Sequence, residues 1–178
     1  MKLIAHRGNI TCKNPERENT IEYIKEALTY GVDVEIDVWY IDGEWMLGHD
    51  EPKYKINFDF LTQPRLWLHC KNIQAMINLY ASDTNYFWHE NDKYTITSKG
   101  HIWCFPNQPA PSISVEKTVD DLYANDMSFF RKMTNRLTVG VLPEINETDI
   151  YQYNAICTDN IIKYETELKK DYDKTGTI

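Results

Sequence analysis

Two histidines, an arginine and two carboxylates occur within the first fifty residues of this chain. They are His6, Arg7, Glu35, Asp37 and His49. A phosphodiester is an anion that repels nucleophiles, so its cleavage needs positive charge on the phosphoryl oxygens, a base for the attacking oxygen and an acid for the leaving alkoxide. An arginine and a metal ion held by carboxylates supply the charge, and two histidines supply the proton transfers. These residue types therefore indicate phosphodiester chemistry.

The segments around these residues predict a strand, a helix and a second strand. Lys2–Ala5 is a short apolar strand that ends at the first histidine, and Gly8 permits a tight exit from it. An amphipathic helix is predicted from about residue 21 to residue 30, with Thr20 at its start and Gly31 as its stop. A strand, a helix and a strand in this order form a parallel crossover unit.

The second predicted strand, Asp33–Val38, carries two carboxylates on one face. Side chains alternate along a strand, so Glu35 and Asp37 point to the same side and the apolar residues between them point to the other. Two adjacent carboxylates repel each other unless a cation joins them, which predicts a metal site here. A turn at Asp42–Gly43 then carries the chain back toward His49.

Five short motifs follow one another in this region at plausible spacing. They are Ile4–Gly8, Glu18–Thr20, Gly31–Val38, Asp42–Gly43 and Gly48–Asp50. Together they resemble the opening of the glycerophosphodiester phosphodiesterase family, within the PLC-like phosphodiesterase superfamily. The resemblance covers about the first fifty residues. It implies an α/β fold, a compact (β/α)8 TIM barrel, with a divalent metal, Mg²⁺ or Ca²⁺, at its C-terminal mouth.

The resemblance also implies a role for each residue of the set. His6 and His49 are expected to be the acid and base, Arg7 to contact the substrate phosphate, and Glu35 and Asp37 to ligate the metal. The expected activity is metal-dependent hydrolysis of a glycerophosphodiester or a related small phosphodiester. Two alternatives stay open: a lyase of the sphingomyelinase D kind that forms a cyclic phosphate, and a barrel that binds a phosphorylated ligand without turnover.

The third predicted strand departs from the family pattern. Family members carry Glu-x-Lys at its end, whereas this chain has His69 and Lys71. Alternation places both side chains on one face, so we expect His69 to be the third metal ligand and Lys71 to contact the phosphate. The alternative third ligand is a water or another carboxylate, with Glu90 as the first candidate.

An imidazole in place of a carboxylate changes the expected metal chemistry. The site loses one negative charge, which shifts its preference toward Mn²⁺, Fe²⁺ or Zn²⁺. Because only a neutral histidine binds metal, the metal affinity is expected to weaken as the pH drops through about 6.

Short apolar strands alternate with helices or turns along the rest of the chain, which favours a barrel. Eight strands are expected in all, the later ones ending near His69, His89, Phe105, Val115, Leu142 and Thr158. Further helices are predicted over residues 72–82, 119–133 and 149–153, and the polar tail 169–178 is expected to fray. The whole chain, residues 1–178, is expected to form one domain.

The composition is typical of one cytoplasmic enzyme domain. A net charge of −8 argues against a nucleic-acid partner. No apolar run approaches the roughly 20 residues of a membrane span, and no signal peptide is expected before the first strand. The four cysteines show no zinc-site spacing and are expected to be reduced. The predicted partner is a small phosphodiester, and the sequence leaves the oligomeric state open.

Overall fold

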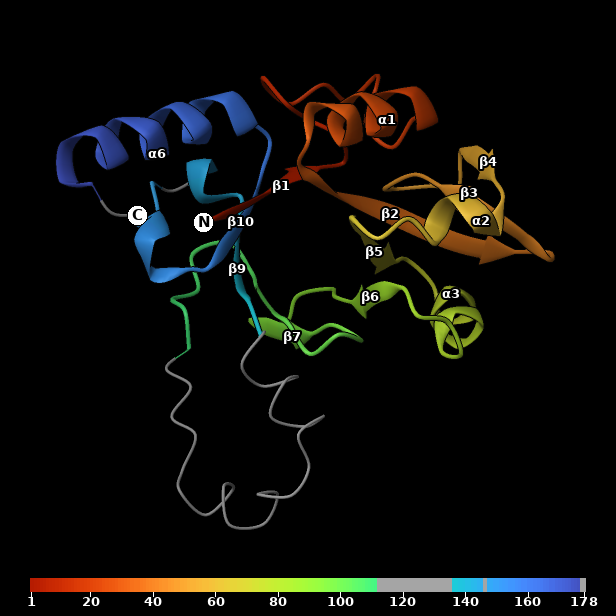
Figure 1. Ribbon diagram of the computed structural model, residues 1–178. Coiled ribbons are helices and arrows are strands. Elements are labelled where there is room, and N and C mark those ends of the chain that lie inside the picture. The colour runs from red at the N-terminus through yellow and green to blue at the C-terminus, as the bar shows by residue number, and fades with distance from the viewer. Residues whose placement is uncertain (112–135, 146, 177–178) are drawn as a thin grey trace, which may run out of the picture.

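The computed structural model describes residues 1–111, 136–145 and 147–176. In this part of the chain, ten strands form one curled, mixed sheet (Figure 1). The strands are β1 (Lys2–His6), β2 (Asp33–Ile41), β3 (Glu44–Leu47), β4 (Tyr54–Ile56), β5 (Leu66–Cys70), β6 (Asn85–Trp88), β7 (Tyr94–Ile96), β8 (Ile102–Cys104), β9 (Thr138–Val141) and β10 (Ala155–Thr158). The helices are α1 (Ile21–Tyr30), α2 (Phe58–Leu61), α3 (Ile73–Leu79) and α6 (Ile161–Thr175), and two 3₁₀ turns are η1 (Pro143–Ile145) and η2 (Ile150–Gln152).

The parallel strands of the sheet follow the order β6-β5-β2-β1-β10-β9-β8. β3, β4 and β7 pair antiparallel at its margins. In the register of the ladders, His6 lies opposite Glu35 across β1 and β2, and Asp37 lies opposite His69 across β2 and β5. The carboxyl ends of three neighbouring strands therefore bring these four residues together.

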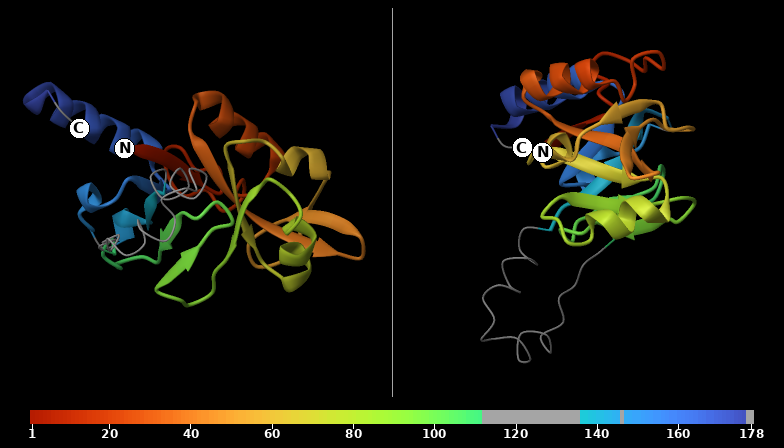
Figure 2. Two further views of the ribbon diagram at one scale, coloured as in Figure 1. Left: turned by 60° about the horizontal axis from the view of Figure 1, so that its bottom comes forward. Right: turned by 90° about the vertical axis from the view of Figure 1, so that its right-hand side faces the viewer.

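The prediction of a complete (β/α)8 TIM barrel is wrong. The sheet curls into an open half-barrel, and no ladder joins β6 to β7 within the described residues (Figure 2). β2 is followed by the antiparallel strands β3 and β4 instead of a helix, and β7 returns antiparallel to β8. A (β/α)8 barrel ordinarily takes about 200 residues or more. The chain has 178 residues, which is too short for that pattern.

α1 occupies the predicted range 21–30. Thr20 accepts a hydrogen bond from the backbone N–H of Tyr23, and Gly31 ends the helix in the left-handed conformation with φ 106°. Ile24 and Ala27 are fully buried on the face that packs against the sheet. The predicted ends of β5, β6, β8, β9 and β10 agree with the structure to within one residue, whereas β2 continues from the predicted end at Val38 to Ile41.

The other predicted helices differ from the structure. α3 is shorter than the predicted range 72–82, and residues 149–153 contain only the 3₁₀ turn η2. Most of the tail that was expected to fray belongs to α6, because Tyr164 and Leu168 are buried against the sheet and order an otherwise polar segment. The strand end near Val115 and the helix over 119–133 lie outside the described residues.

The two faces of β2 are buried in different surroundings. Val34, Ile36 and Val38 pack in the apolar layer between the sheet and the helices α1 and α3. The opposite face turns to the inside of the half-barrel, where Trp67, Phe87 and other apolar side chains form a second cluster. Glu35 and Asp37 lie on this inner face and are almost completely buried. Among the described residues, no helix is long and apolar enough to cross a bilayer.

Candidate active site

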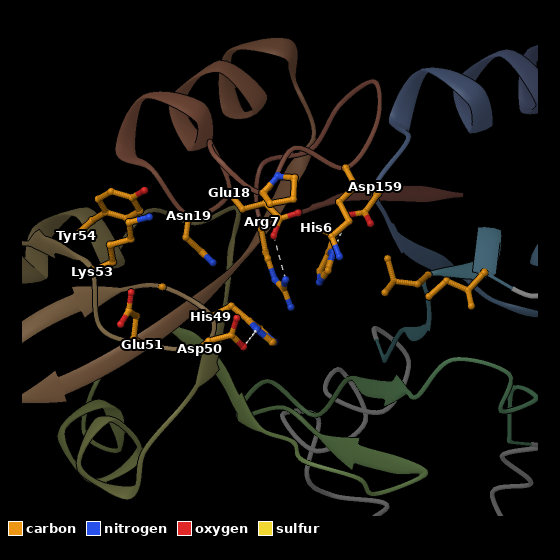
Figure 3. A pocket seen from close by; sticks show the side chains of 15 residues that line it. His6, Arg7, Glu18, Asn19, His49, Asp50, Glu51, Lys53, Tyr54 and Asp159 are labelled. Carbon is orange, nitrogen blue, oxygen red and sulfur yellow. Dashed lines mark hydrogen bonds and ion pairs between the residues drawn. The ribbon is translucent and has the colours of Figure 1, made fainter.

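Six of the seven residues singled out for chemistry lie on β1, β2 and β5 or directly after them, toward the carboxyl ends of parallel strands, the usual position for sites in such sheets, whereas His49 follows the antiparallel strand β3. Six of them form one connected cluster: His6, Arg7, Glu35, Asp37, His69 and Lys71. The seventh, His49, lines the same cleft of about 740 Å³ as His6 and Arg7. In Figure 3 the side chains of His6 and Arg7 point toward the space beside His49.

Two carboxylates and an imidazole form the centre of this cluster. The Nδ1 atom of His69 lies 3.0 Å from Asp37 Oδ1 and 3.6 Å from Glu35 Oε1. One ligand atom from each of the three residues lies within 4.8 Å of the others. Carboxylate oxygens and an imidazole nitrogen at this spacing can hold a divalent cation, and the mixed donor set suits Mn²⁺, Fe²⁺ or Zn²⁺.

The backbone directly after β6 fixes the tautomer of His69. Its Nε2 atom lies 2.9 Å from the carbonyl oxygen of His89, and a carbonyl can only accept, so Nε2 carries the proton and donates. In the neutral ring the lone pair of Nδ1 then faces Glu35 and Asp37. Metal-bound histidines commonly donate their other N–H to a carbonyl in this way. The ring of Phe87 stacks on His69 with a centroid distance of 5.1 Å and holds its plane.

The buried carboxylates need positive charge. Burial opposes ionisation of Asp37, but His69, Arg7 and Lys71 together hold its pKa far below the usual range. Burial lowers the pKa of His69, but the adjacent Asp37 and Glu35 more than offset this and raise it to about 9. Glu35 Oε2 is buried and has no hydrogen-bond partner among the described residues. A proton on His69 therefore partly supplies the charge that a metal ion would supply, and these residues fit a cation.

His6 is oriented by a carboxylate from the last strand region. Its Nδ1 atom donates to Asp159 Oδ1 at 2.7 Å, so its Nε2 atom faces Glu35 Oε2 at 3.9 Å. Asn9 Nδ2 donates to the same Asp159 oxygen at 2.8 Å and to Glu18 at 3.0 Å. Burial lowers the pKa of His6, whereas Asp159 and Glu35 raise it above the usual value. The Asp159–His6 pair resembles the carboxylate–imidazole pairs that orient a general base.

His49 follows β3 on a turn that is closely fixed. Its Nδ1 atom lies 2.7 Å from Asp50 Oδ1, which leaves Nε2 free, and its side chain is 39% exposed. Gly48 precedes it with φ 143°, and a Cβ there would overlap the carbonyl oxygen of Glu51. Only glycine therefore permits this turn. Each of the two histidines in the cleft, His6 and His49, has a carboxylate on Nδ1.

The predicted phosphate ligands Arg7 and Lys71 are paired with carboxylates of the cluster. Arg7 Nη1 donates to Glu18 at 3.0 Å and its Nε lies 3.0 Å from Asp37 Oδ2, while Lys71 Nζ lies 3.7 Å from Asp37 Oδ1. Asn19 makes two hydrogen bonds with Asp37, both at 2.9 Å. Its Nδ2 donates to Asp37 Oδ2, and its Oδ1 accepts from the backbone N–H of Asp37. The two cations therefore lie beside the candidate metal ligand Asp37.

Three of the six non-glycine residues with positive φ in the described part of the chain lie at the cleft. Arg7, Asn19 and Leu142 all have positive φ angles, of 53°, 60° and 47°, although none is a glycine. All three line the cleft. Non-glycine residues persist in this conformation when the surrounding structure enforces it, and they gather at functional sites.

Sequence reasoning missed several members of the site. No catalytic or binding role was predicted from the sequence for Asp159, Asn9, Glu18 or Asn19. The residues Glu18 and Asn19 fall inside one of the quoted motifs, which is the signal that could have identified them. Glu90, the alternative third ligand, is exposed and is not part of the buried carboxylate–histidine group.

Comparisons of the chain with protein-family models, with curated protein sequences and with solved structures found no match. A functional assignment must therefore be argued from the geometry and chemistry of the site.

The charge state of His69 gives a first testable prediction. Its pKa of about 9 in the folded, metal-free protein lies above the unfolded value of about 6.5. Protonation therefore stabilises the fold fully below about pH 6.5, and this stabilisation is lost as the pH rises through about 9. We expect the free energy of unfolding to fall by up to about 3 kcal/mol across this interval. The measurement is urea unfolding in the presence of a chelator.

His69→Gln should flatten this pH dependence, because glutamine does not titrate. His101→Gln is the matched control. Burial lowers the pKa of His101, so this histidine changes the free energy of unfolding only below pH 6.5. Its substitution should leave the dependence of that free energy on pH above 6.5 unchanged. Equal slopes in the His69→Gln and wild-type proteins would contradict the assignment.

The link between Asp159 and His6 gives a second prediction. Asp159→Asn removes a negative charge from Nδ1, so the pKa of His6 should drop, as read from the pH dependence of its ring signals in NMR spectra. Asp50→Asn is the matched change beside His49, the other histidine of the cleft, and should leave the pKa of His6 unchanged. A pKa of His6 that is the same in all three proteins would refute the proposed contact.

Proposed function

We propose that this chain is a metal-dependent phosphodiesterase that cleaves a small phosphodiester and is related to the glycerophosphodiester phosphodiesterases through its N-terminal motifs. The observation that carries the proposal is the position of His6. Its Nδ1 atom is held by Asp159, and its Nε2 atom lies 3.9 Å from Glu35 in the group of residues that can hold a metal ion. A proton acceptor of fixed orientation thus lies next to a cation site.

The charges of the cluster support a divalent cation. Four carboxylates meet there, those of Glu18, Glu35, Asp37 and Asp159, but only two permanent cations, Arg7 and Lys71. With neutral histidines, two negative charges are left without compensation. A divalent metal held by Glu35, Asp37 and His69 would cancel them and would draw electron density from the phosphoryl oxygens of a substrate.

The two histidines divide the proton transfers. His6 takes the proton from an attacking water, whose oxygen forms a bond to phosphorus. His49 lies in the more exposed part of the cleft and gives a proton to the departing alkoxide, so that an alcohol leaves toward solvent. Arg7 and Lys71 attract the anionic substrate to a chain whose net charge is −8. The products are an alcohol and a phosphomonoester.

The test is a turnover screen of the purified chain. After treatment with a chelator, each of Mg²⁺, Ca²⁺, Mn²⁺ and Zn²⁺ is added to glycerophosphocholine, glycerophosphoethanolamine and bis(p-nitrophenyl) phosphate, and products are followed by ³¹P NMR. We expect a phosphomonoester that forms only with metal. A cyclic phosphate would instead show that a hydroxyl of the substrate attacks. Absence of turnover with every metal and diester would contradict the proposal and favour a binding role.

Substitution of either histidine is the third prediction. His6→Ala and His49→Ala should each lower kcat by about 10² to 10⁴, the usual loss when a positioned proton-transfer group is removed. Lys25→Ala, an exposed change on α1 outside the cleft, should leave kcat unchanged. If either histidine variant kept nearly full kcat on the best substrate, its role in proton transfer would be disproved.

The choice of metal gives a fourth prediction. His69→Glu rebuilds an all-carboxylate donor set, so the preference should move from Mn²⁺ or Zn²⁺ toward Mg²⁺ or Ca²⁺. Affinities are measured by calorimetry at a fixed pH, with His69→Gln as the variant that lacks a third ligand. Unchanged affinity and preference in both variants would show that His69 does not bind the metal.

A further inference from the structure

A second polar cavity lies at the opposite end of the half-barrel from the cleft. Its volume is about 250 Å³, and the first residues of four parallel strands line it: Lys2, Asp33, Leu66 and Asn85. This end of a parallel sheet ordinarily contributes to stability through packing. A cavity with several polar walls at this position therefore needs a separate explanation.

The two acidic side chains of the cavity already have cationic partners. Asp33 Oδ2 accepts from Lys2 Nζ at 2.9 Å and from Trp67 Nε1 at 3.0 Å. Asp83 is paired with Lys99. These contacts neutralise both carboxylates, so neither leaves a negative charge that would repel an anion from the cavity.

A third cation, Arg136, lies beside the cavity without a carboxylate partner. Its Nη2 atom is 4.0 Å from the position that a Cβ of Gly100 would occupy, and its charge acts on the ring of His101, which lines the cavity. Within the described ranges no ion pair involves Arg136, and its buried Nε atom has no hydrogen-bond partner. A buried guanidinium nitrogen without an acceptor is costly, and the described residues supply none for Arg136 Nε.

The cavity also has a neutral donor and an unused acceptor. His101 Nδ1 accepts from the backbone N–H of Leu137 at 3.2 Å, so in the neutral ring Nε2 carries the proton and can donate. Burial lowers the pKa of His101, and the charges of Lys2 and Arg136 lower it further, which keeps the ring neutral near pH 7. Asn85 Oδ1 is buried and has no donor among the described residues.

We propose that this cavity binds a small phosphate, either inorganic phosphate or the phosphoryl group of a phosphomonoester. Arg136 and His101 donate to its anionic oxygens, and the P–O–H group of inorganic phosphate, or of a phosphomonoester bound as its monoanion, donates to Asn85 Oδ1. A carboxylate ion such as acetate offers acceptors only and would leave Asn85 unsatisfied. The cavity can hold a tetrahedral anion with a few waters, since one water occupies about 30 Å³. This proposal does not depend on the function assigned to the cleft.

The experiment is an NMR titration of the full chain, kept metal-free with a chelator, with inorganic phosphate, glycerol 3-phosphate and acetate. We expect phosphate to shift the ring signals of His101 and the amide signal of Leu137. Response to phosphate alone assigns the free ion as the ligand, and response to glycerol 3-phosphate as well extends the site to phosphomonoesters. A titration to about 20 mM phosphate detects binding with a Kd well above 1 mM. The absence of any shift at that concentration, or an equal shift with acetate, would overturn the proposal.

Two substitutions test the site itself. Arg136→Gln should weaken phosphate binding by about tenfold or more, since a charge-assisted hydrogen bond is lost. Asn85→Asp keeps the size of the side chain but adds a negative charge, and should abolish binding. Arg17→Gln is the matched control, because Arg17 is a surface arginine paired with Glu26. Phosphate binding of wild-type strength in a folded Arg136→Gln or Asn85→Asp protein would refute the assignment.

Discussion

The carboxylate of Asp37 is the point at which separate parts of the chain are joined. It has no exposed surface, and Arg7 and Asn19 contact its Oδ2 atom, while His69 and Lys71 lie against Oδ1. These partners come from the end of β1, the segment before α1 and the end of β5. A buried carboxylate is stable only when such groups compensate it, and each partner is in turn held in place by it. The geometry of the candidate site therefore depends on this one ionised group.

The inner face of β2 carries three acidic residues in succession, and each is compensated in a different way. Asp33 is bound by Lys2 and a tryptophan at the amino end, and Asp37 is surrounded by cations at the carboxyl end. Glu35, between them, faces two histidines at 3.6 and 3.9 Å, and its Oε2 atom has no hydrogen-bond partner within the described part of the chain. The negative charge of Glu35 is therefore the least well balanced of the three, and a bound cation would balance it.

The sequence predicted the local features well and the closure of the sheet poorly. Alternation along β2 and β5 was enough to place Glu35, Asp37 and His69 on one face, and the caps at Thr20 and Gly31 gave the bounds of α1. The predicted barrel was wrong because the turn at Asp42–Gly43 leads into the antiparallel strand β3. This hairpin takes the place of the helix that a (β/α)8 barrel has after its second strand. The role of Asp159 was inaccessible, because its contact with a histidine 153 positions away follows from the pairing of β1 with β10.

The order of the strands along the chain also has a consequence for biosynthesis. The three residues that can hold a metal ion are complete once β5 has left the ribosome, since Glu35, Asp37 and His69 all precede Lys71. The partner that orients His6, Asp159, directly follows β10 and is therefore synthesised after all three of these residues. Domains synthesised from the N-terminus pass through such partial structures. A nascent chain would thus contain Glu35, Asp37 and His69 before Asp159 could orient His6, so in the proposed function the metal ligands would be complete before the base is in position.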